Sequence, residues 1–262
     1  MKNSLSYEAY LKSPYKSIKH STYFGVYDEL FSRYRNKDVT FVEIGVLAGG
    51  SLFMWREFLG PKARIIGIDL NPNAKKWEEH GFEIFIGSQS DENFWKDFIG
   101  KVGDIDVLLD DGGHTYLQQV TTTEMLLDHI KDNGILVVED TCTSYMKGYG
   151  PKKYSFISYV KDMIDKINYR FAKLKDRKSD KRVWSIQCFE SIIAFHINRK
   201  ASNLISEPTN NNGVNDSAKD YRYKDEALSG RLSNALLRFK FLRNILLIWT
   251  SKNKSLKKYF TK

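Results

Sequence analysis

Five short apolar runs, separated by stretches long enough for a helix, constrain the fold of this chain more than any other feature. The runs are rich in β-branched residues and Leu. Continuously apolar runs of this length are typical of parallel strands that helices cover on both faces. The pattern therefore predicts a doubly wound α/β sheet. The expected strands are 40–45, 63–69, 82–86, 105–110 and 134–139, with helices over 52–59, 91–99 and 116–130.

The last of these helices is expected to end at Asn133-Gly134, a typical C-terminal stop. After a loop rich in Gly and Tyr, another helix is expected over 154–167. The strand patterns at 182–189 and 191–197 are joined by too few residues for a crossover helix, so they predict an antiparallel hairpin. The expected sheet is thus seven-stranded and mostly parallel.

We expect four parts along the chain. A helical segment, 1–38, precedes one domain, 39–199, because 262 residues can bury one large core but hardly two. Residues 200–230 include Glu-Pro-Thr-Asn-Asn-Asn-Gly and are typical of a polar linker. Residues 231–262 predict a basic, apolar helix, which we call the tail.

The formal net charge of +9 belongs to the tail. The tail has nine Lys and Arg and no Asp or Glu, so residues 1–230 carry 32 basic and 32 acidic residues. A nucleic-acid enzyme normally carries its basic surface around the active site, so we expect no nucleic-acid partner. The tail suits peripheral contact with an anionic membrane, or packing on the domain or on a second copy in a homo-oligomer.

The lengths of the apolar runs and the cysteine usage favour a cytoplasmic protein. No apolar run reaches the roughly 18 residues that span a bilayer, and the first ten residues lack the apolar region of a signal peptide. Two cysteines, Cys142 and Cys188, supply neither a disulfide framework nor a zinc site. We expect a cytoplasmic protein, at most peripheral at the inner membrane face.

A glycine loop and two carboxylates predict a nucleoside-bearing cofactor. The first strand leads into Gly45-Val-Leu-Ala-Gly49-Gly-Ser51, and Asp69 ends the second strand, where a carboxylate can accept hydrogen bonds from two ribose hydroxyls. The spacing is not the GxGxxG of dinucleotide folds, which disfavours an NAD oxidoreductase. Glu43 would repel a pyrophosphate but suits a positively charged cofactor. The residues assigned to this site are Glu43, Gly45, Gly49, Ser51, Asp69, Ser88, Gln89 and Asp110.

Several short motifs along the chain together form a recognisable set. They are Lys19-His20 with Tyr23 and Val26-Tyr27, Glu43-Ile-Gly45, Gly49-Gly-Ser51, Ile66-Gly-Ile-Asp69, Gly87-Ser-Gln-Ser-Asp91, Asp110-Asp-Gly-Gly-His114, Val138-Glu-Asp-Thr141 and Ser144-Tyr145. By these motifs the chain resembles the class I S-adenosylmethionine-dependent methyltransferases. Within that class it is most similar to macrocin-type sugar O-methyltransferases and to cephalosporin hydroxylase-like proteins, over 19 to about 150. One departure is the short loop Val46-Leu-Ala, where macrocin-type enzymes often carry an insertion.

Paired acids at two strand ends predict a divalent metal. Asp110-Asp111 and Glu139-Asp140 end strands that are normally neighbours in this fold, and their repulsion favours a cation between them. Oxygen ligands without a thiolate favour Mg²⁺ or Mn²⁺ over Zn²⁺. We predict Asp111, Glu139 and Asp140 as ligands, and similarity to the catechol O-methyltransferase group implies the same arrangement. The alternative is a helix cap at Asp110 and solvated loop acids.

Catalytic and substrate residues follow from these motifs. His114 lies three residues after Asp111 and can take the proton of a substrate hydroxyl, which the macrocin-type resemblance also implies. A capping or core histidine remains the alternative. The resemblance suggests His20 and Tyr23 as substrate contacts, and Tyr145 and Tyr149 follow the acids in a loop that could stack on a sugar or simply pack.

The prediction is a metal-dependent O-methyltransferase of a sugar or glycan hydroxyl. Two alternatives stay open at this point. One is a methyltransferase-fold hydroxylase-like enzyme of small molecules, and the other is a non-catalytic cofactor-binding protein, for which the acidic quartet is unexpected.

Overall fold

The computed structural model describes residues 4–174 and 177–214. The described residues up to Glu207 belong to one compact unit. The described part contains seven strands in one sheet of order β3-β2-β1-β4-β5-β7-β6. The strands are β1 Thr40–Ile44, β2 Arg64–Asp69, β3 Glu83–Ile86, β4 Ile105–Asp110, β5 Ile130–Val138, β6 Ser185–Phe189 and β7 Ile192–His196.

The expected doubly wound sheet is confirmed. Strands β1 to β5 pair in parallel, whereas β7 pairs antiparallel with both β5 and β6. The hairpin of β6 and β7 turns at Ser191, whose φ is +59°. Parallel strands need long crossover connections, and these connections carry the helices.

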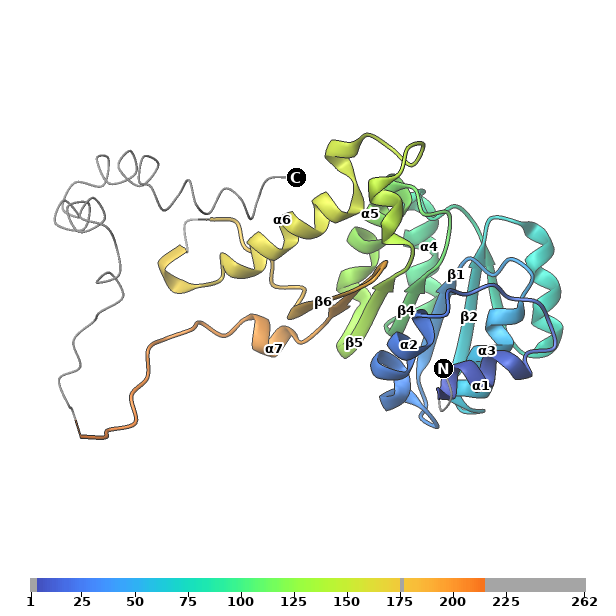
Figure 1. Ribbon diagram of the computed structural model, residues 1–262, viewed down its shortest axis with the longest axis horizontal. Coiled ribbons are helices and arrows are strands. Elements are labelled where there is room, and N and C mark those ends of the chain that lie inside the picture. The colour runs from blue at the N-terminus through green and yellow to red at the C-terminus, as the bar shows by residue number, and fades with distance from the viewer. Residues whose placement is uncertain (1–3, 175–176, 215–262) are drawn as a thin grey trace. The chain divides into compact units, whose positions relative to one another are not determined.

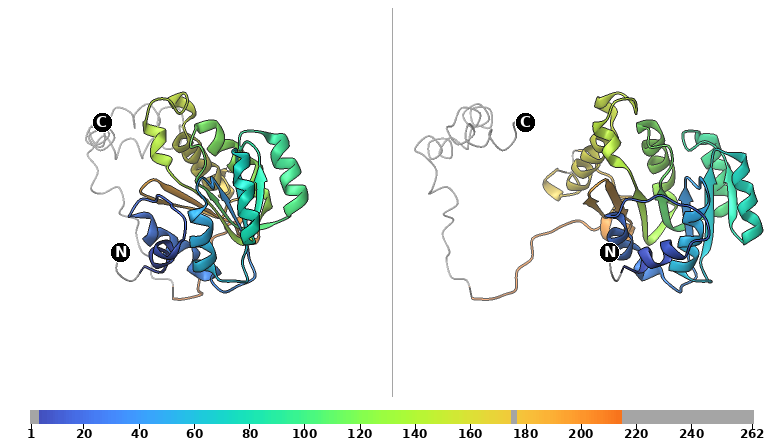
Figure 2. Two further views of the ribbon diagram at one scale, coloured as in Figure 1. Left: turned by 90° about the vertical axis from the view of Figure 1, so that its right-hand side faces the viewer. Right: turned by 45° about the vertical axis from the view of Figure 1, so that its right-hand side comes forward.

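Helices cover both faces of the sheet (Figures 1 and 2). One core lies between the sheet and helices α1, α2 and α3, and the other lies between the sheet and α4, α5 and α6. Asp91 caps α4 as expected, because its side chain accepts a hydrogen bond from the backbone N–H of Asn93. The α-helices are α1 Leu5–Lys12, α2 Tyr23–Phe31, α3 Gly50–Leu59, α4 Glu92–Val102, α5 Tyr116–Leu126, α6 Phe156–Asn168 and α7 Arg199–Ser202. Short 3-10 helices are Ser32–Tyr34, Pro72–His80, Leu127–His129, Thr141–Tyr145, Lys152–Tyr154 and Ala172–Leu174.

The prediction that Asn133-Gly134 stops a helix is wrong. Helix α5 ends at Leu126, and both residues lie inside strand β5. The register between β4 and β5 shifts at this point, so part of β5 bulges out of the ladder. Asn133 has a φ of +66° there, and its carbonyl accepts hydrogen bonds from the side chains of Arg33 and Tyr34. Asn-Gly therefore supplies a strand irregularity instead of a helix end.

The part of the expected linker that is described, up to 214, contains α7 and no further helix or strand. The rest of the linker and the whole basic tail, 231–262, lie outside the described residues. Within the described ranges, no helix combines the length and the apolar character needed to cross a membrane.

Candidate active site

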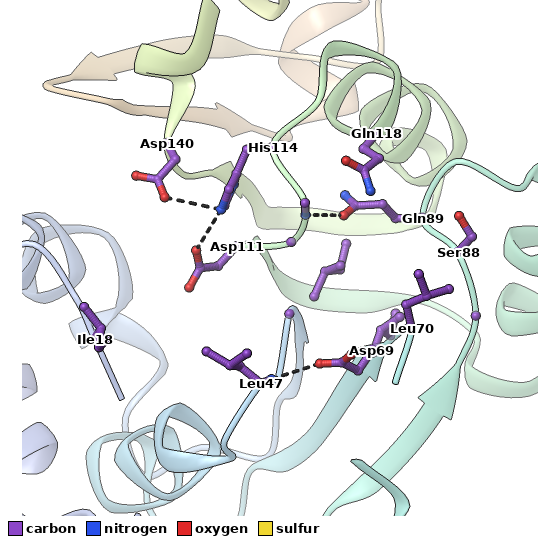
Figure 3. Close-up of a pocket in the computed structure, with 16 residues that line it drawn as sticks. Ile18, Leu47, Asp69, Leu70, Ser88, Gln89, Asp111, His114, Gln118 and Asp140 are labelled. Atoms are coloured by element: carbon purple, nitrogen blue, oxygen red, sulfur yellow. Dashed lines mark hydrogen bonds and ion pairs between the residues drawn. The ribbon is translucent and has the colours of Figure 1, made fainter. Parts of the chain in front are cut away.

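A cavity of about 450 Å³ opens at the carboxyl ends of the parallel strands (Figure 3). This edge is where ligands bind in open α/β sheets. Three lining residues other than glycine, Leu47, His114 and Asp140, have a positive φ, a strained conformation that is concentrated at functional sites. The lining residues are Ile18, Ile44, Gly45, Leu47, Ile68, Asp69, Leu70, Gly87, Ser88, Gln89, Asp111, Gly112, Gly113, His114, Gln118 and Asp140.

The glycine loop is fixed on one side of the cavity by Asp69 at the end of β2. One carboxylate oxygen of Asp69 accepts hydrogen bonds from the backbone N–H groups of Val46 (3.0 Å) and Leu47 (2.9 Å), and the other accepts one from Asn71 (2.8 Å). Gly45 has a φ of +91°, and a Cβ there would collide with the carbonyl oxygen of Asp111. Only glycine therefore lets β1 and the loop after β4 pass this closely.

A buried amide holds the loop after β4. Gln89 Nε2 donates to both carboxylate oxygens of Asp110, at 3.0 and 3.1 Å, and Gln89 Oε1 accepts from the backbone N–H of Gly113 at 2.8 Å. Burial raises the pKa of Asp110 to about 6, although these hydrogen bonds oppose the shift. Asp110 thus turns away from the cavity and fixes the loop that carries Asp111 and His114.

Three side chains form a cluster of possible metal ligands at one end of the cavity. Single ligand atoms of Asp111, His114 and Asp140 all lie within 4.8 Å of one another. His114 Nε2 lies 3.4 Å from Asp140 Oδ2 and 3.8 Å from Asp111 Oδ1, as the dashed lines in Figure 3 mark. All three side chains are only 22–24% exposed. Two carboxylates and one imidazole can bind a divalent cation, or the imidazole can serve as a base beside it.

A smaller cavity of about 160 Å³ adjoins the same acids. Its walls come from His20 in the segment before α2, from Tyr23 at the start of α2, and from the acids Asp111, Glu139 and Asp140. The structure thus places two of the four predicted substrate residues beside the predicted metal ligands. The other two, Tyr145 and Tyr149, are not among the lining residues of either cavity, and Tyr145 is 76% exposed.

Glu139 differs from the other two predicted ligands because both its oxygens are already engaged. Tyr27 OH donates to Oε1 at 2.5 Å, and Lys19 Nζ contacts Oε2 at 3.1 Å. Burial raises the pKa of Glu139 to about 8, and the positive charge of Lys19 opposes that shift. Glu139 lines the smaller cavity but does not belong to the three-residue cluster.

Glu43, Gly49 and Ser51, which the sequence assigned to the cofactor, support the cavity from behind and do not line it. Glu43 is fully buried and accepts hydrogen bonds from Ser51 Oγ (2.7 Å) and Trp55 Nε1 (3.0 Å). Gly49 is the N-cap of α3 with a φ of +80°, and a Cβ there would collide with the Trp77 ring. Their role in this structure is to join β1 to α3.

Sequence reasoning assigned no role to Lys19, Tyr27 or Gln118. Lys19, Tyr23 and Tyr27 are spaced four residues apart, a spacing that lets side chains reach the same side of a helix, and it could have been read from the sequence. Gln118 lines the large cavity and forms a capping box with Thr115, a signal that the pattern Thr-x-x-Gln carries.

Comparisons with known proteins agree with this geometry. Residues 42–141 match a family model described as a methyltransferase domain. This part of the chain is thus similar to a methyltransferase domain, and the seven-stranded sheet agrees with that similarity. The MycE methyltransferase of the mycinamycin biosynthetic pathway, solved with Mg and SAH, superposes on 79% of this chain and 57% of its own with a TM-score of 0.68 and 25% identity.

Curated relatives are named as O-methyltransferases, and one of them, from Streptomyces olivaceus, is named 8-demethyl-8-alpha-L-rhamnosyl tetracenomycin-C 2'-O-methyltransferase. Demethylmacrocin O-methyltransferase of Streptomyces fradiae is 31% identical over 55% of this chain and 39% of its own length. Mycinamicin VI 2''-O-methyltransferase of Micromonospora griseorubida is 32% identical over the same shares. The chain therefore spans about two fifths of the length of the curated relatives it matches.

Proposed function

We propose that this protein is an S-adenosylmethionine-dependent O-methyltransferase that acts on a hydroxyl of a sugar or glycan and uses Mg²⁺ or Mn²⁺. The names of the relatives support the reaction, the rhamnosyl group in two of these names supports the sugar, and the MycE complex supports the cofactor and the metal. The observation that carries the proposal is the convergence of Asp111, His114 and Asp140 at one end of the large cavity, with Asp69 at the opposite side.

The cavity fits a nucleoside with a positively charged end. Asp69 lies where it can accept hydrogen bonds from ribose hydroxyls, and Ser88 and Gln89 line the wall where a base would lie. The glycine loop allows the backbone to approach the ligand closely. S-adenosylmethionine would supply the methyl group from its sulfonium, and the carboxylates beyond Gly45 give this part of the cavity a negative potential that suits such a cation.

The acids fit a hard divalent cation. Asp111 Oδ1 and Asp140 Oδ2 face the same ring nitrogen of His114, so both present an oxygen toward one point. Tyr23 OH donates to Asp140 Oδ1 at 2.5 Å and fixes that carboxylate. We propose Asp111 and Asp140 as ligands, with Glu139 as a third ligand if it exchanges one present partner. A bound metal would orient the substrate hydroxyl and make it more acidic.

His114 would remove the proton from the substrate hydroxyl. Bound S-adenosylmethionine would supply the methyl group to the hydroxyl oxygen, and the His114 imidazole would take up the proton that the hydroxyl loses. His20 and Tyr23 border the smaller cavity and would contact the sugar. Tyr145 and Tyr149 stay predicted substrate contacts, and neither lines these two cavities.

Formation of S-adenosylhomocysteine tests the proposal. Metal-stripped protein is assayed with Mg²⁺ and a panel of glycosides and nucleotide sugars, and turnover should require metal. Asp111→Asn should reduce metal-stimulated turnover at least about 100-fold while leaving S-adenosylmethionine binding measurable by calorimetry. Asp97→Asn, which changes an exposed acid of α4, is the matched control. Unchanged turnover of Asp111→Asn would disprove the metal assignment, and product without S-adenosylhomocysteine would favour the hydroxylase-like alternative.

A further inference from the structure

Three carboxylates lie on one face of three neighbouring strands. Glu43 on β1 is paired in register with Leu109 on β4, and Leu109 with Val137 on β5. Side chains alternate between the two faces of a strand, so Asp111 and Glu139, two residues beyond Leu109 and Val137, are expected on the face that Glu43 occupies. Neighbouring strands are only about 4.8 Å apart, so these charges would repel each other strongly without a cation.

Lys19 is the cation that meets all three acids. Its Nζ lies 2.5 Å from Asp111 Oδ2, 3.1 Å from Glu139 Oε2 and 3.9 Å from Glu43 Oε1. The Lys19 side chain is 2% exposed, so water screens these interactions little. The Lys19 ammonium group therefore lies in direct contact with two of the acids of the proposed metal site.

We propose that Lys19 is an internal competitor of the divalent metal and sets the affinity of the site for it. The Lys19 ammonium group occupies Asp111 Oδ2 and Glu139 Oε2, and these two carboxylates are the predicted ligands that lie on its side of the site. A metal held by Asp111 Oδ1 and Asp140 Oδ2 would share the Asp111 carboxylate with Lys19, and a metal that also takes Glu139 Oε2 would displace the Lys19 contact there. This inference rests on the proposed metal site and not on the methyl transfer.

Lys19 is a charged donor to these acids, whereas its neighbours Tyr23 and Tyr27 are neutral donors. The three donors are spaced four residues apart in the sequence. Lys19 contacts Asp111 and Glu139. Tyr23 donates to Asp140, and Tyr27 donates to Glu139. Tyr23 and Tyr27 are neutral donors, and each contributes a hydrogen bond without adding charge. Lys19 alone adds a full charge, so its removal should strengthen the attraction of the remaining acids for a divalent cation.

Calorimetric titration of Mn²⁺ into metal-stripped protein tests the inference without any substrate. Four chains are compared: the unsubstituted protein, Lys19→Met, Lys19→Arg and Lys12→Met. Lys19→Met removes the charge and should bind Mn²⁺ at least about tenfold more tightly. Lys19→Arg keeps the charge and should stay within about threefold. Lys12→Met removes an exposed lysine of the same segment, which pairs with Glu57, and should bind like the unsubstituted protein. Equal or weaker binding by Lys19→Met would overturn the inference.

A second measurement covers the case in which Lys19→Met does not fold. NMR of lysine side-chain ammonium groups in the unsubstituted protein should show one resonance, absent from Lys19→Arg, that shifts when Mg²⁺ is added, while the Lys12 resonance does not. A Lys19 resonance that ignores saturating Mg²⁺ would also overturn the inference. Failure of all chains to bind Mn²⁺ would remove both the metal site and the inference. Retained competition with no formation of S-adenosylhomocysteine would refute only the proposed function.

Discussion

Replacement of Glu43 by Gln should make the metal-free protein more stable at alkaline pH. Glu43 is fully buried between Ser51 and Trp55, and burial raises its pKa to about 7, with Lys19 and these two donors opposing the shift. An amide fits the same space, because its oxygen can accept from Trp55 Nε1 and its NH₂ can donate to Ser51 Oγ. The substitution therefore removes a buried charge without leaving either neighbour unpaired.

The magnitude follows from linkage. The pKa of Glu43 is about 7 in the folded state against an ordinary value of 4.5. Because the folded-state value is the higher one, the stabilising contribution of Glu43 is complete below pH 4.5 and is lost as the pH rises through 7. For these two values the loss between pH 5.0 and pH 8.5 is about 2.5 kcal/mol. The amide of Glu43→Gln does not titrate, so the stability of this variant relative to the unsubstituted protein should rise by about that amount over the same pH range.

Urea unfolding in the presence of EDTA measures this difference. Both proteins are unfolded at pH 5.0 and pH 8.5, and the difference in unfolding free energy is compared between the two pH values. Glu83→Gln is the control, because the hydrogen bond with Arg64 lowers the pKa of Glu83, and its contribution is lost only as the pH falls below 4.5. A difference between Glu43→Gln and the unsubstituted protein that is the same at both pH values would refute the reasoning.

Three further predictions address the backbone, a polar network and the tail. Gly45→Ala should destabilise the protein by at least about 3 kcal/mol in thermal unfolding, whereas Gly25→Ala, at an exposed and unobstructed helix position, should stabilise it by about 0.5–1 kcal/mol. Arg182→Met should lower the free energy of unfolding by about 1–2 kcal/mol at pH 7 and by less at pH 3. Burial raises the pKa of Asp180, but the hydrogen bonds from Arg182 outweigh burial and lower it, so the stabilisation by this pair is lost as the pH falls. Deletion of 231–262 should abolish co-sedimentation with anionic liposomes, and equal sedimentation of both proteins would reject membrane contact.

Much of the fold could be predicted from the sequence because the buried parallel strands are continuous apolar runs. All seven expected strands are present, with bounds that differ mainly at β5 and β6. The error at Asn133-Gly134 has a local cause. Asn readily adopts the positive φ that ends a helix, but the same conformation also produces a strand bulge. Only the pairing of β5 with β4, a long-range property, distinguishes the two outcomes.

The location of the site could also be predicted, but the contacts of individual acids could not. Strand ends placed Asp69, Asp111 and Asp140 around one cavity. The partners of Glu43 and Glu139 come from α3, from α2 and from the segment leading into α2, and no motif at the strand ends encodes them. The sequence could thus suggest Glu43 as a cofactor-site residue, but it could not show that the hydrogen bonds of Glu43 join β1 to α3.

Acids that are adjacent in the sequence at a strand end fall on opposite faces of the sheet, because side chains alternate along a strand. Asp110 shares the face of Leu108, which packs with α4, α5 and α6, and Asp111 falls on the face of Leu109, which packs with α1, α2 and α3. Adjacent acids at a strand end therefore cannot both extend toward the same partner unless the backbone leaves the extended conformation. Asp140 does so, with a φ of +53°, and this turn brings it to Asp111 and His114 while Glu139 stays with Lys19. The strained backbone of one residue thus decides which acid of the pair faces the large cavity and which remains bound to the internal cation.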